Sequence, residues 1–434
     1  MAQPKATPIS AALARVLPED RVRKLAAELG VVIRRRKLKI LCMVWTLALG
    51  FQVGHQRSLV GLRQAYEKRA GHTVVPSGFY KRFTPKMARL MKALALAALQ
   101  QMGPALGIPS GSLAGFRDLL AIDACVIRLH DLLARSFPGC RTNQSKSAAK
   151  LHMVMSVVDG SARRVKVTGE RTSDVTPWKR VGKWVEGRLL LFDLGYYRFH
   201  LFDRIDANDG FFLSRAKTNF NPEIVAVNRK WRGASVDVVG KKLRDVLPRL
   251  QREFLDVMVQ VRFEKRLYRG VHSYKTRTFR LVAVRNDDAG KYHCYITNIP
   301  ADRLPASEVR STYALRWQVE LLFKAMSSHG HLKQMPSKKK AVVECLIWGA
   351  VLSMIASQAI YRLVRERVDA ARHLPLLRWA ALFGRNAADI LTLIQDRDSR
   401  GEERLLRHLL HEAPDPNRNR PGRALHEPPL ALVA

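Results

Sequence analysis

The sequence predicts an α/β protein, with a mixed sheet flanked by helices and further helical regions at both ends of the chain. Short apolar runs rich in β-branched residues occur at 119–127, 151–158 and 188–195. Runs this apolar are typical of strands that helices bury on both faces. Between 225 and 300 apolar and polar residues alternate instead, which predicts an antiparallel, half-exposed β insertion. Apolar residues at helical spacing fill most of 1–112 and 307–367.

The first 112 residues predict a helical DNA-binding domain. Helical periodicity covers 20–29, 36–53, 57–70 and 77–102. The segment 57–86 has the pattern of helix, turn, helix, and Pro76 and Ser77 would begin its second helix. Basic and aromatic side chains would project from that helix, namely Tyr80, Lys81, Arg82 and Lys86. A basic run at 34–37 is either a solvated helix face or a DNA contact.

Residues 113–224 predict the first part of a sheet core, with an alternating strand at 164–168 and a short helix at 174–186. The insertion at 225–300 follows, and its expected strands are 235–239, 256–263, 278–284 and 292–297. The second part of the core spans 301–370, with helices at 307–328 and 339–367. A C-terminal helical region and basic tail span 371–434, in which 412–429 is rich in Pro, Arg and Asn and is expected to be disordered.

The charge of the chain points to a polyanionic partner. Its 434 residues carry 75 Lys and Arg against 37 Asp and Glu, a formal net charge of +38. Nucleic acid is the first candidate and an anionic membrane surface the second. The uncharged stretches 40–54 and 345–361 are shorter than the ~20 residues that a bilayer requires, so we expect buried core helices and no membrane partner.

The remaining composition excludes several other classes. Five cysteines are widely spread with no CxxC pair, which argues against a disulfide framework or a zinc site and favours a reducing compartment. The first residues lack the apolar segment of a secretion signal, so a cytoplasmic location is expected. No GxxxxGK[ST] motif occurs, and no nucleotide cofactor is expected.

Three acidic residues stand out in this acid-poor chain. Asp123 lies inside one apolar strand and Asp193 at the end of another, where a carboxylate is costly unless it is paired or binds a cation. Glu320 would share one face of the helix 307–328 with Tyr313, Arg316 and Lys324, because those positions differ by nearly whole helical turns. Strand-end caps and an ion-paired surface stripe are the simpler interpretations. The functional one is a carboxylate site for two metal ions in phosphodiester chemistry.

At these residues the sequence resembles the IS4-type (Tn5-like) transposases of the DDE superfamily. The resemblance covers most of 55–365, and its segments are AIDACVIRLHD, LFDLGYY, FFLSRAK, YITNIP and STYALRWQVELLFKAM. It implies an RNase H-like core interrupted by a β-rich insertion. It also implies that Asp123, Asp193 and Glu320 are catalytic and ligate Mg²⁺, for which Mn²⁺ can substitute. The residues matching positions that hold DNA are Arg215, Lys217, Tyr313, Arg316 and Lys324.

The resemblance further implies a function. A DNA transposase of an insertion sequence cuts the element ends through a hairpin intermediate and transfers the strand into target DNA. Its partners would be terminal inverted repeats, target DNA and a second copy of the chain in a synaptic complex at the nucleoid. Two alternatives stay open: a hydrolytic nuclease of the same fold without strand transfer, and a non-catalytic DNA-binding protein from a decayed element.

The sequence departs from the family pattern at two positions. Ser327 stands where the family has a lysine, and Cys125 where Thr or Ser is usual. Lys324, one turn beyond Glu320, matches a second frequent family lysine, whereas Lys333 would need a bend in the chain to substitute. Other residues have simpler interpretations: Trp317 is expected in the core, His329 and His331 form a surface or DNA-facing pair, and Tyr292 and His293 lie near the position of a base-stacking residue.

Overall fold

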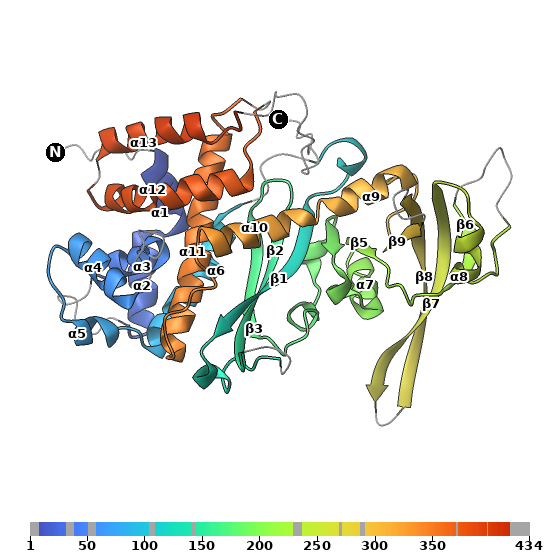
Figure 1. Cartoon of the computed structure of the whole chain (residues 1–434), viewed down its shortest axis with the longest axis horizontal. Coiled ribbons are helices and arrows are strands. Elements are labelled where there is room, and N and C mark those ends of the chain that lie inside the picture. The colour runs from blue at the N-terminus through green and yellow to red at the C-terminus, as the bar shows by residue number, and fades with distance from the viewer. Residues whose placement is uncertain are drawn as a thin grey trace.

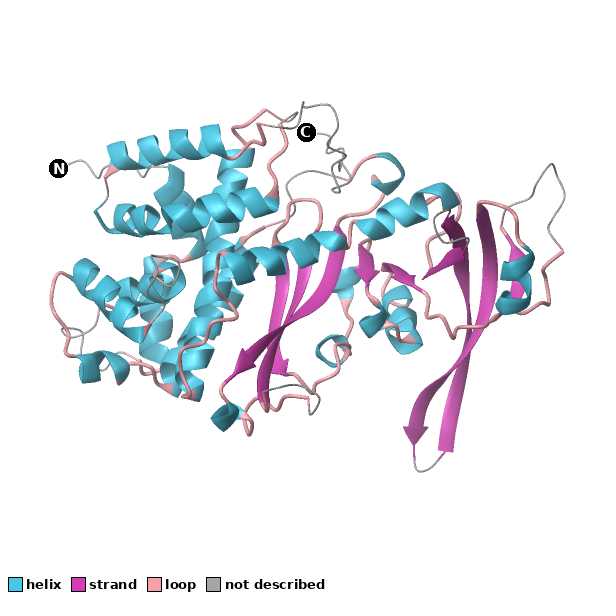
Figure 2. Ribbon diagram, in the orientation of Figure 1, coloured by secondary structure: helices cyan, strands magenta, loops and turns pink. Residues whose placement is uncertain are grey.

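A computed structural model describes ten stretches of the chain, and the statements below concern these stretches. They are residues 8–31, 39–50, 58–103, 109–140, 145–228, 237–268, 271–286, 291–369, 372–396 and 398–416. Helices gather at one end of the molecule and a single twisted sheet runs from its middle to the other end (Figures 1 and 2). The predicted fold class, a mixed sheet with flanking helices, is confirmed.

The first five strands of the sheet lie in the order β3-β2-β1-β4-β5. Their bounds are Leu119–Leu129 (β1), Ser147–Ser156 (β2), Ala162–Gly169 (β3), Leu189–Phe192 (β4) and Phe211–Arg215 (β5). Strands β1, β4 and β5 are parallel, and β2 runs antiparallel to both of its neighbours. The apolar runs in β2 and β4 are buried as expected because helices cover the sheet. In β1 the residues 119–122 are buried, and 123–126 are only partly buried. This mixed order is the RNase H-like arrangement that the resemblance implied.

The insertion continues the same sheet, because β9 pairs antiparallel with β5. Its strands are Glu223–Val227 (β6), Phe254–Tyr268 (β7), Val271–Asn286 (β8) and Lys291–Thr297 (β9). Strands β7 and β8 form a long hairpin that projects from the body (Figure 1). The strand expected at 235–239 is wrong: 235 and 236 lie outside the described residues, and 237–239 form a bend and turn beside Gly240, which has a positive φ of 78°. The pairing partner of β7 is β6, earlier in the chain.

Six helices precede the sheet in the described part of the chain. They are Pro8–Val16 (α1), Glu19–Glu28 (α2), Ile40–Leu49 (α3), Leu59–Ala70 (α4), Pro76–Tyr80 (α5) and Pro85–Gln101 (α6). The single helix expected over 77–102 is wrong, because it is interrupted between α5 and α6. Thr84 caps α6 by accepting a hydrogen bond from Met87 N–H, and Pro85 occupies the first helical turn. The basic run at 34–37 lies outside the described residues.

Helices also flank and follow the sheet. They are Phe199–Asp206 (α7), Leu243–Val246 (α8), Ala306–Ala314 (α9), Trp317–Ser328 (α10), Lys340–Arg365 (α11), Leu376–Asp396 (α12) and Ser399–Glu412 (α13). The short helix expected at 174–186 is instead two 3₁₀ turns, Thr176–Trp178 and Lys183–Val185, with Gly182 between them. Most of the tail expected to be disordered, from residue 417, lies outside the described residues.

The helix expected over 307–328 is also interrupted. Arg316 N–H bonds to Tyr313 O and Val319 N–H to Arg316 O, so the chain passes through a tighter 3₁₀-type turn between α9 and α10. The two helices remain nearly in line in Figure 1. Helix α10 therefore begins beside Arg316, and the predicted helix does not run through that residue.

Helix α11 lies at the centre of the helical part of the protein. It is the one helix of the described residues that is long and apolar enough to cross a membrane, and 78% of its apolar window is buried inside the protein. It packs against α1, α3 and α6. Every residue of α3 except Leu41 is buried as well. The interpretation as core helices is confirmed for 345–361 and for the described part of the first stretch, while 51–54 lie outside the described residues.

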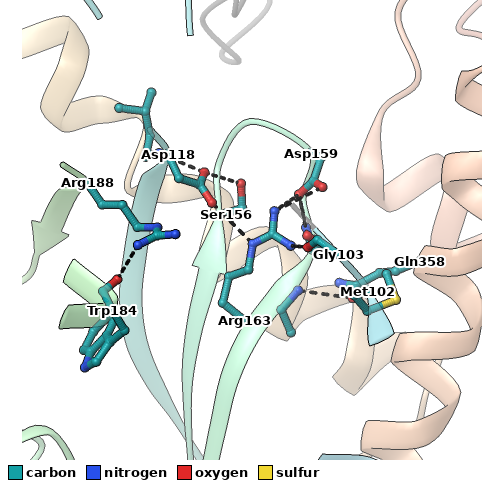
Figure 3. Close-up of polar contacts among 12 residues, drawn as sticks. Met102, Gly103, Asp118, Ser156, Asp159, Arg163, Trp184, Arg188 and Gln358 are labelled. Atoms are coloured by element: carbon teal, nitrogen blue, oxygen red, sulfur yellow. Dashed lines mark hydrogen bonds and ion pairs between the residues drawn. The ribbon is translucent and has the colours of Figure 1, made fainter. Parts of the chain in front are cut away.

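A buried polar cluster joins this helical part to the sheet (Figure 3). Arg163 of β3 donates to Asp118 at 3.3 Å, to Asp159 at 3.3 Å and to Gly103 O at 2.8 Å. Gln358 of α11 donates to Gly160 O at 2.8 Å and accepts from the first residue of β3. Because these side chains satisfy one another away from water, they fix the start of β1 relative to α6 and α11.

Candidate active site

Charged residues at the same level of three neighbouring parallel strands form one row, here called the strand row. The register pairs Ile122 with Phe192 and Phe192 with Ser214 across β1, β4 and β5. One residue further along each strand come Asp123, Asp193 and Arg215. β4 ends at Phe192 whereas β1 continues to Leu129, so the register places Asp193, at the carboxyl end of β4, beside Asp123 within β1. Both are partly buried and Arg215 is exposed.

Helix α10 packs against β1 and brings Glu320 to this row. Burial raises the pKa of Asp123 to about 6, the Ala124 N–H and Arg316 oppose that shift, and the charges of Glu320 and Asp193 add to it. The Ala124 N–H donates to Asp123 Oδ1 at 2.7 Å. The three acidic residues singled out in the sequence therefore lie within electrostatic reach of one another.

The Arg316 guanidinium lies among these carboxylates. Its Nη2 donates to Glu320 Oε1 at 2.7 Å, and Tyr313, Glu320 and Asp193 oppose the effect of burial and raise its pKa. Its Nε and Nη1 are buried and have no hydrogen-bond partner in the described part of the chain. No three His, Cys, Asp or Glu side chains among the described residues converge closely enough to hold one metal ion. In this conformation the cation among the carboxylates is Arg316.

The other predicted DNA contacts surround this cluster. The Tyr313 ring lies 5.2 Å from the Tyr295 ring, and the Arg316 guanidinium lies 5.8 Å from the Tyr313 centroid. Lys324 is exposed one turn beyond Glu320, and Lys217 lies 5.7 Å from the Tyr197 ring, two residues past the strand row.

The core position assigned to Trp317 is wrong, since this side chain is 53% exposed. The prediction followed from residue type, since large aromatic side chains are more often buried than exposed. The one feature of the sequence that could have indicated an exposed Trp317 was its position directly after Arg316.

The two departures from the family pattern contact each other. Ser327 of α10 hydrogen bonds to Cys125 of β1, and this bond and the charge of Lys333 oppose the burial that raises the pKa of the Cys125 thiol. Lys333 comes near Cys125 because the chain bends after α10, as it must if Lys333 is to substitute for the family lysine. Helix α10 ends at Ser328, and the turn passes through His331 at a positive φ of 51°.

The histidine pair of this turn is not at the surface, contrary to the expectation. His331 is 9% exposed and His329 is half-buried, because the turn folds back onto α10 and its neighbours. The Leu332 N–H donates to Met326 O at 3.0 Å, which closes that turn.

The remaining predicted contacts lie elsewhere. Tyr80 is the last residue of α5, the helix from which all four residues were expected to project. Lys81 and Arg82 lie in the turn after it and Lys86 lies in α6, so the prediction is wrong for these three. Figure 1 places α5 in the helical part, on the far side of α11 from the strand row. Tyr292 is in β9 with its hydroxyl donating to Leu250 O at 3.2 Å, and it lies in the insertion with His293.

Comparison with known proteins identifies the family. The model described as "Transposase DDE domain" matches residues 114–355, which is more than half of the chain and includes the strand row and α10. The chain belongs to the Transposase DDE domain family. It is therefore a transposase, an enzyme that cuts and transfers DNA strands, and the predicted resemblance is confirmed. Enzymes of this family generally depend on divalent metal ions.

Relatives of this DDE transposase carry corresponding names. It is 24% identical to the transposase for insertion sequence element IS231E of Bacillus thuringiensis subsp. finitimus, over 78% of this chain and 77% of that protein. It is 22% identical to that of IS231F of Bacillus thuringiensis subsp. israelensis, over 83% and 81%. The piggyBac transposase in a synaptic complex with hairpin DNA aligns with 94% of the chain and 86% of its own, at 13% identity and a TM-score of 0.49, a likeness too weak to bear on function.

Proposed function

We propose that this DDE transposase cuts the ends of an insertion sequence at the strand row, with Asp123, Asp193 and Glu320 as its catalytic carboxylates. The observation that carries the proposal is the register of β1, β4 and β5, because it aligns two carboxylates beside the helix that bears the third. No other group of acidic residues from separate elements is aligned in this way in the described ranges.

The donor set fits divalent cations such as Mg²⁺ or Mn²⁺. Carboxylate oxygens are the ligands that these ions prefer, and a buried carboxyl whose pKa is raised gains from a nearby cation. Asp123 and Asp193 would supply neighbouring ligands, and Glu320 a third after its ion pair with Arg316 opens. Bound ions of this kind lower the pKa of an attacking water and neutralise charge on the leaving oxygen.

The basic residues around the row would hold the DNA backbone. Arg316 would be one of them, because its guanidinium lies among the carboxylates and a guanidinium can hold phosphate oxygens by paired hydrogen bonds. Arg215, Lys217, Tyr313 and Lys324 surround the same edge. Lys333 joins them in our proposal, since its charge reaches Cys125, two residues from Asp123.

The remaining parts of the proposal concern assembly. A net charge of +38 suits a chain that contacts both element ends and target DNA. We assign element-end binding to residues 1–112, including Tyr80, Lys81 and Arg82, and to the insertion, with two copies of the chain in one synaptic complex. Cleavage would pass through a hairpin, and the site of action is the nucleoid in the cytoplasm.

The experiment uses the full chain, Mg²⁺ and a labelled duplex carrying the terminal inverted repeat that flanks the coding region. Hairpins followed by joined products support the whole proposal. Nicks without joining contradict strand transfer, and a shifted band without new ends contradicts catalysis. The variants D123N and D193N should bind the duplex and not cut it. Cleavage by either variant would overturn the site.

A further inference from the structure

Asp193 depends on the backbone of one turn for its position. Strand β4 ends at Phe192, and Asp193 precedes a 3₁₀ turn over Leu194–Tyr196. The Tyr196 N–H donates to Asp193 O at 3.0 Å, which closes the turn. In the described part of the chain the Asp193 side chain makes no capping hydrogen bond to this turn. Whatever fixes the turn therefore also fixes the carboxylate that the register places beside Asp123.

A fourth carboxylate, that of Asp174, contacts this turn. A Cβ added to Gly195 would lie 3.2 Å from Asp174 Oδ2, which is closer than most Cβ atoms approach their neighbours. Among the described residues, no other atom outside the flanking residues lies within 4 Å of that position. Glycine permits this close approach because it has no side chain. Asp174 therefore contacts the chain two residues beyond Asp193.

Lys150 holds Asp174 in this place. Its Nζ donates to Asp174 Oδ1 at 2.9 Å and to Thr172 O at 3.1 Å. The Lys150 side chain is 12% exposed and that of Asp174 is 31% exposed, so water and salt screen this pair less than an ion pair at the surface. Lys150 belongs to β2 and lies opposite Val126 of β1 in the register. The ion pair therefore ties the turn after β4 to a neighbouring part of the sheet.

Tyr196, the last residue of the turn, lies close to the same carboxylates. It is 1% exposed, and its ring lies 5.8 Å from that of Phe192, measured between ring centroids. Burial raises the pKa of its phenol, and the charges of Asp123, Asp174 and Asp193 add to that shift. One buried hydroxyl is therefore within electrostatic reach of all three carboxylates, which locates Asp174 next to the strand row.

The pairing with Lys150 gives Asp174 a role in position and not in charge. An unpaired fourth carboxylate would repel Asp123 and Asp193, whereas the ion pair is neutral as a unit. A catalytic site requires its groups to be held within about 0.5 Å of the productive geometry. Residues that orient metal ligands without touching the metal typically change metal affinity or activity about 10–100-fold when they are replaced.

We propose that Asp174 is a positioning residue for Asp193. Held by Lys150, it fixes the turn at Gly195, so that the Asp193 carboxylate stays aligned with Asp123 when divalent cations bind at the strand row. That cations bind there rests on the proposed function. Asp174 itself is not a ligand and does not contact DNA.

The test measures binding of Mn²⁺ alone to the full chain without DNA, from the electron paramagnetic resonance signal of free Mn²⁺. D174A should weaken Mn²⁺ binding about tenfold. The double variant K150M/D174A removes both charges of the pair and should show the same loss, because the lost function is positional. In element-end cleavage the Mg²⁺ concentration for half-maximal rate should rise about tenfold in D174A, with duplex binding in EDTA unchanged. D174S serves if D174A is unstable.

Glu170→Ala is the matched control for stability. Glu170 follows β3, its side chain is 7% exposed, and it accepts from Arg128 at 2.7 Å. Arg128 lies five residues beyond Asp123 in β1, roughly 16 Å along the strand. E170A should therefore lower the Tm and leave Mn²⁺ binding unchanged. R128A serves if E170A is unstable.

Gly195 provides a test of the contact itself. In G195A the new Cβ forces Asp174 or the turn to shift by a few tenths of an ångström. G195A should weaken Mn²⁺ binding about threefold in the wild-type background and have no further effect in D174A, since the effects of contacting residues are not additive.

Four results would overturn the proposal. They are wild-type Mn²⁺ affinity in D174A, wild-type affinity in K150M/D174A, an equal loss in E170A, and equal effects of G195A with and without Asp174. D193N separates this proposal from the proposed function. Wild-type Mn²⁺ affinity in D193N would remove Asp193 as a ligand and with it the proposed function. Weakened binding by D193N with unchanged binding by D174A would remove only the role of Asp174.

Discussion

Arg316 offers the sharpest test of the charge arrangement at the strand row, through the variant R316M. The Arg316 and Glu320 side chains are 12% and 32% exposed and joined at 2.7 Å. Breaking a fully buried ion pair costs 3–5 kcal/mol, and solvent at Glu320 reduces this to about 2 kcal/mol. For a cooperative unit of about 240 residues, such a loss lowers the Tm by roughly 4 °C.

Thermal unfolding of wild type and R316M, each with EDTA and with Mg²⁺, measures this effect. In EDTA the variant leaves three carboxylates without a neighbouring cation, so the full deficit is expected. With Mg²⁺ the deficit should shrink, because a bound cation replaces the missing charge. Arg310→Met is the matched control, an exposed arginine on α9 whose loss should change neither Tm. An R316M deficit that is absent in EDTA, or equal with and without Mg²⁺, would refute the reasoning.

Three further predictions concern single residues. D123N should lower the rate of element-end cleavage ~1,000-fold with duplex affinity retained, since metal-assisted charge stabilisation supplies several kcal/mol; gel assays of cleavage and binding measure both. K333A should slow cleavage about tenfold while the exposed neighbour variant K338A does not, and equal rates for the two would remove Lys333 from the site. His152 is fully buried, and burial lowers its pKa to about 4 from 6.5. Above pH 6.5 His152 is neutral in both the folded and the unfolded chain, so it does not affect the free energy of unfolding. As the pH falls from 6.5 towards 4, the unfolded chain binds a proton that the folded chain does not, and the free energy of unfolding decreases. Urea unfolding at pH 4.5 and 7.5 should show wild type losing about 2–3 kcal/mol more than H152Q, and parallel losses would contradict this.

Local sequence was sufficient for much of the fold. The segments that form β1, β2 and β4 are apolar on both faces, which predicts burial on both faces. The segments that form β7, β8 and β9 alternate between apolar and polar residues, which predicts burial on one face. The predicted helices were wrong where a local cap or turn interrupts a segment that has helical periodicity. Thr84 and Pro85 divide one expected helix, and the 3₁₀-type turn at Arg316 divides another.

By itself, the sequence determined which residue types are available for chemistry: a strongly basic chain, two carboxylates on buried strands, and a helix bearing Glu320 beside Arg316. Only the tertiary structure decided how they meet. Strand register aligns Asp123 with Asp193, and the turn at His331 returns Lys333 towards β1. These outcomes depend on contacts between segments far apart in the chain, and hydrophobic periodicity, which is local, contains no information about which distant segments pair.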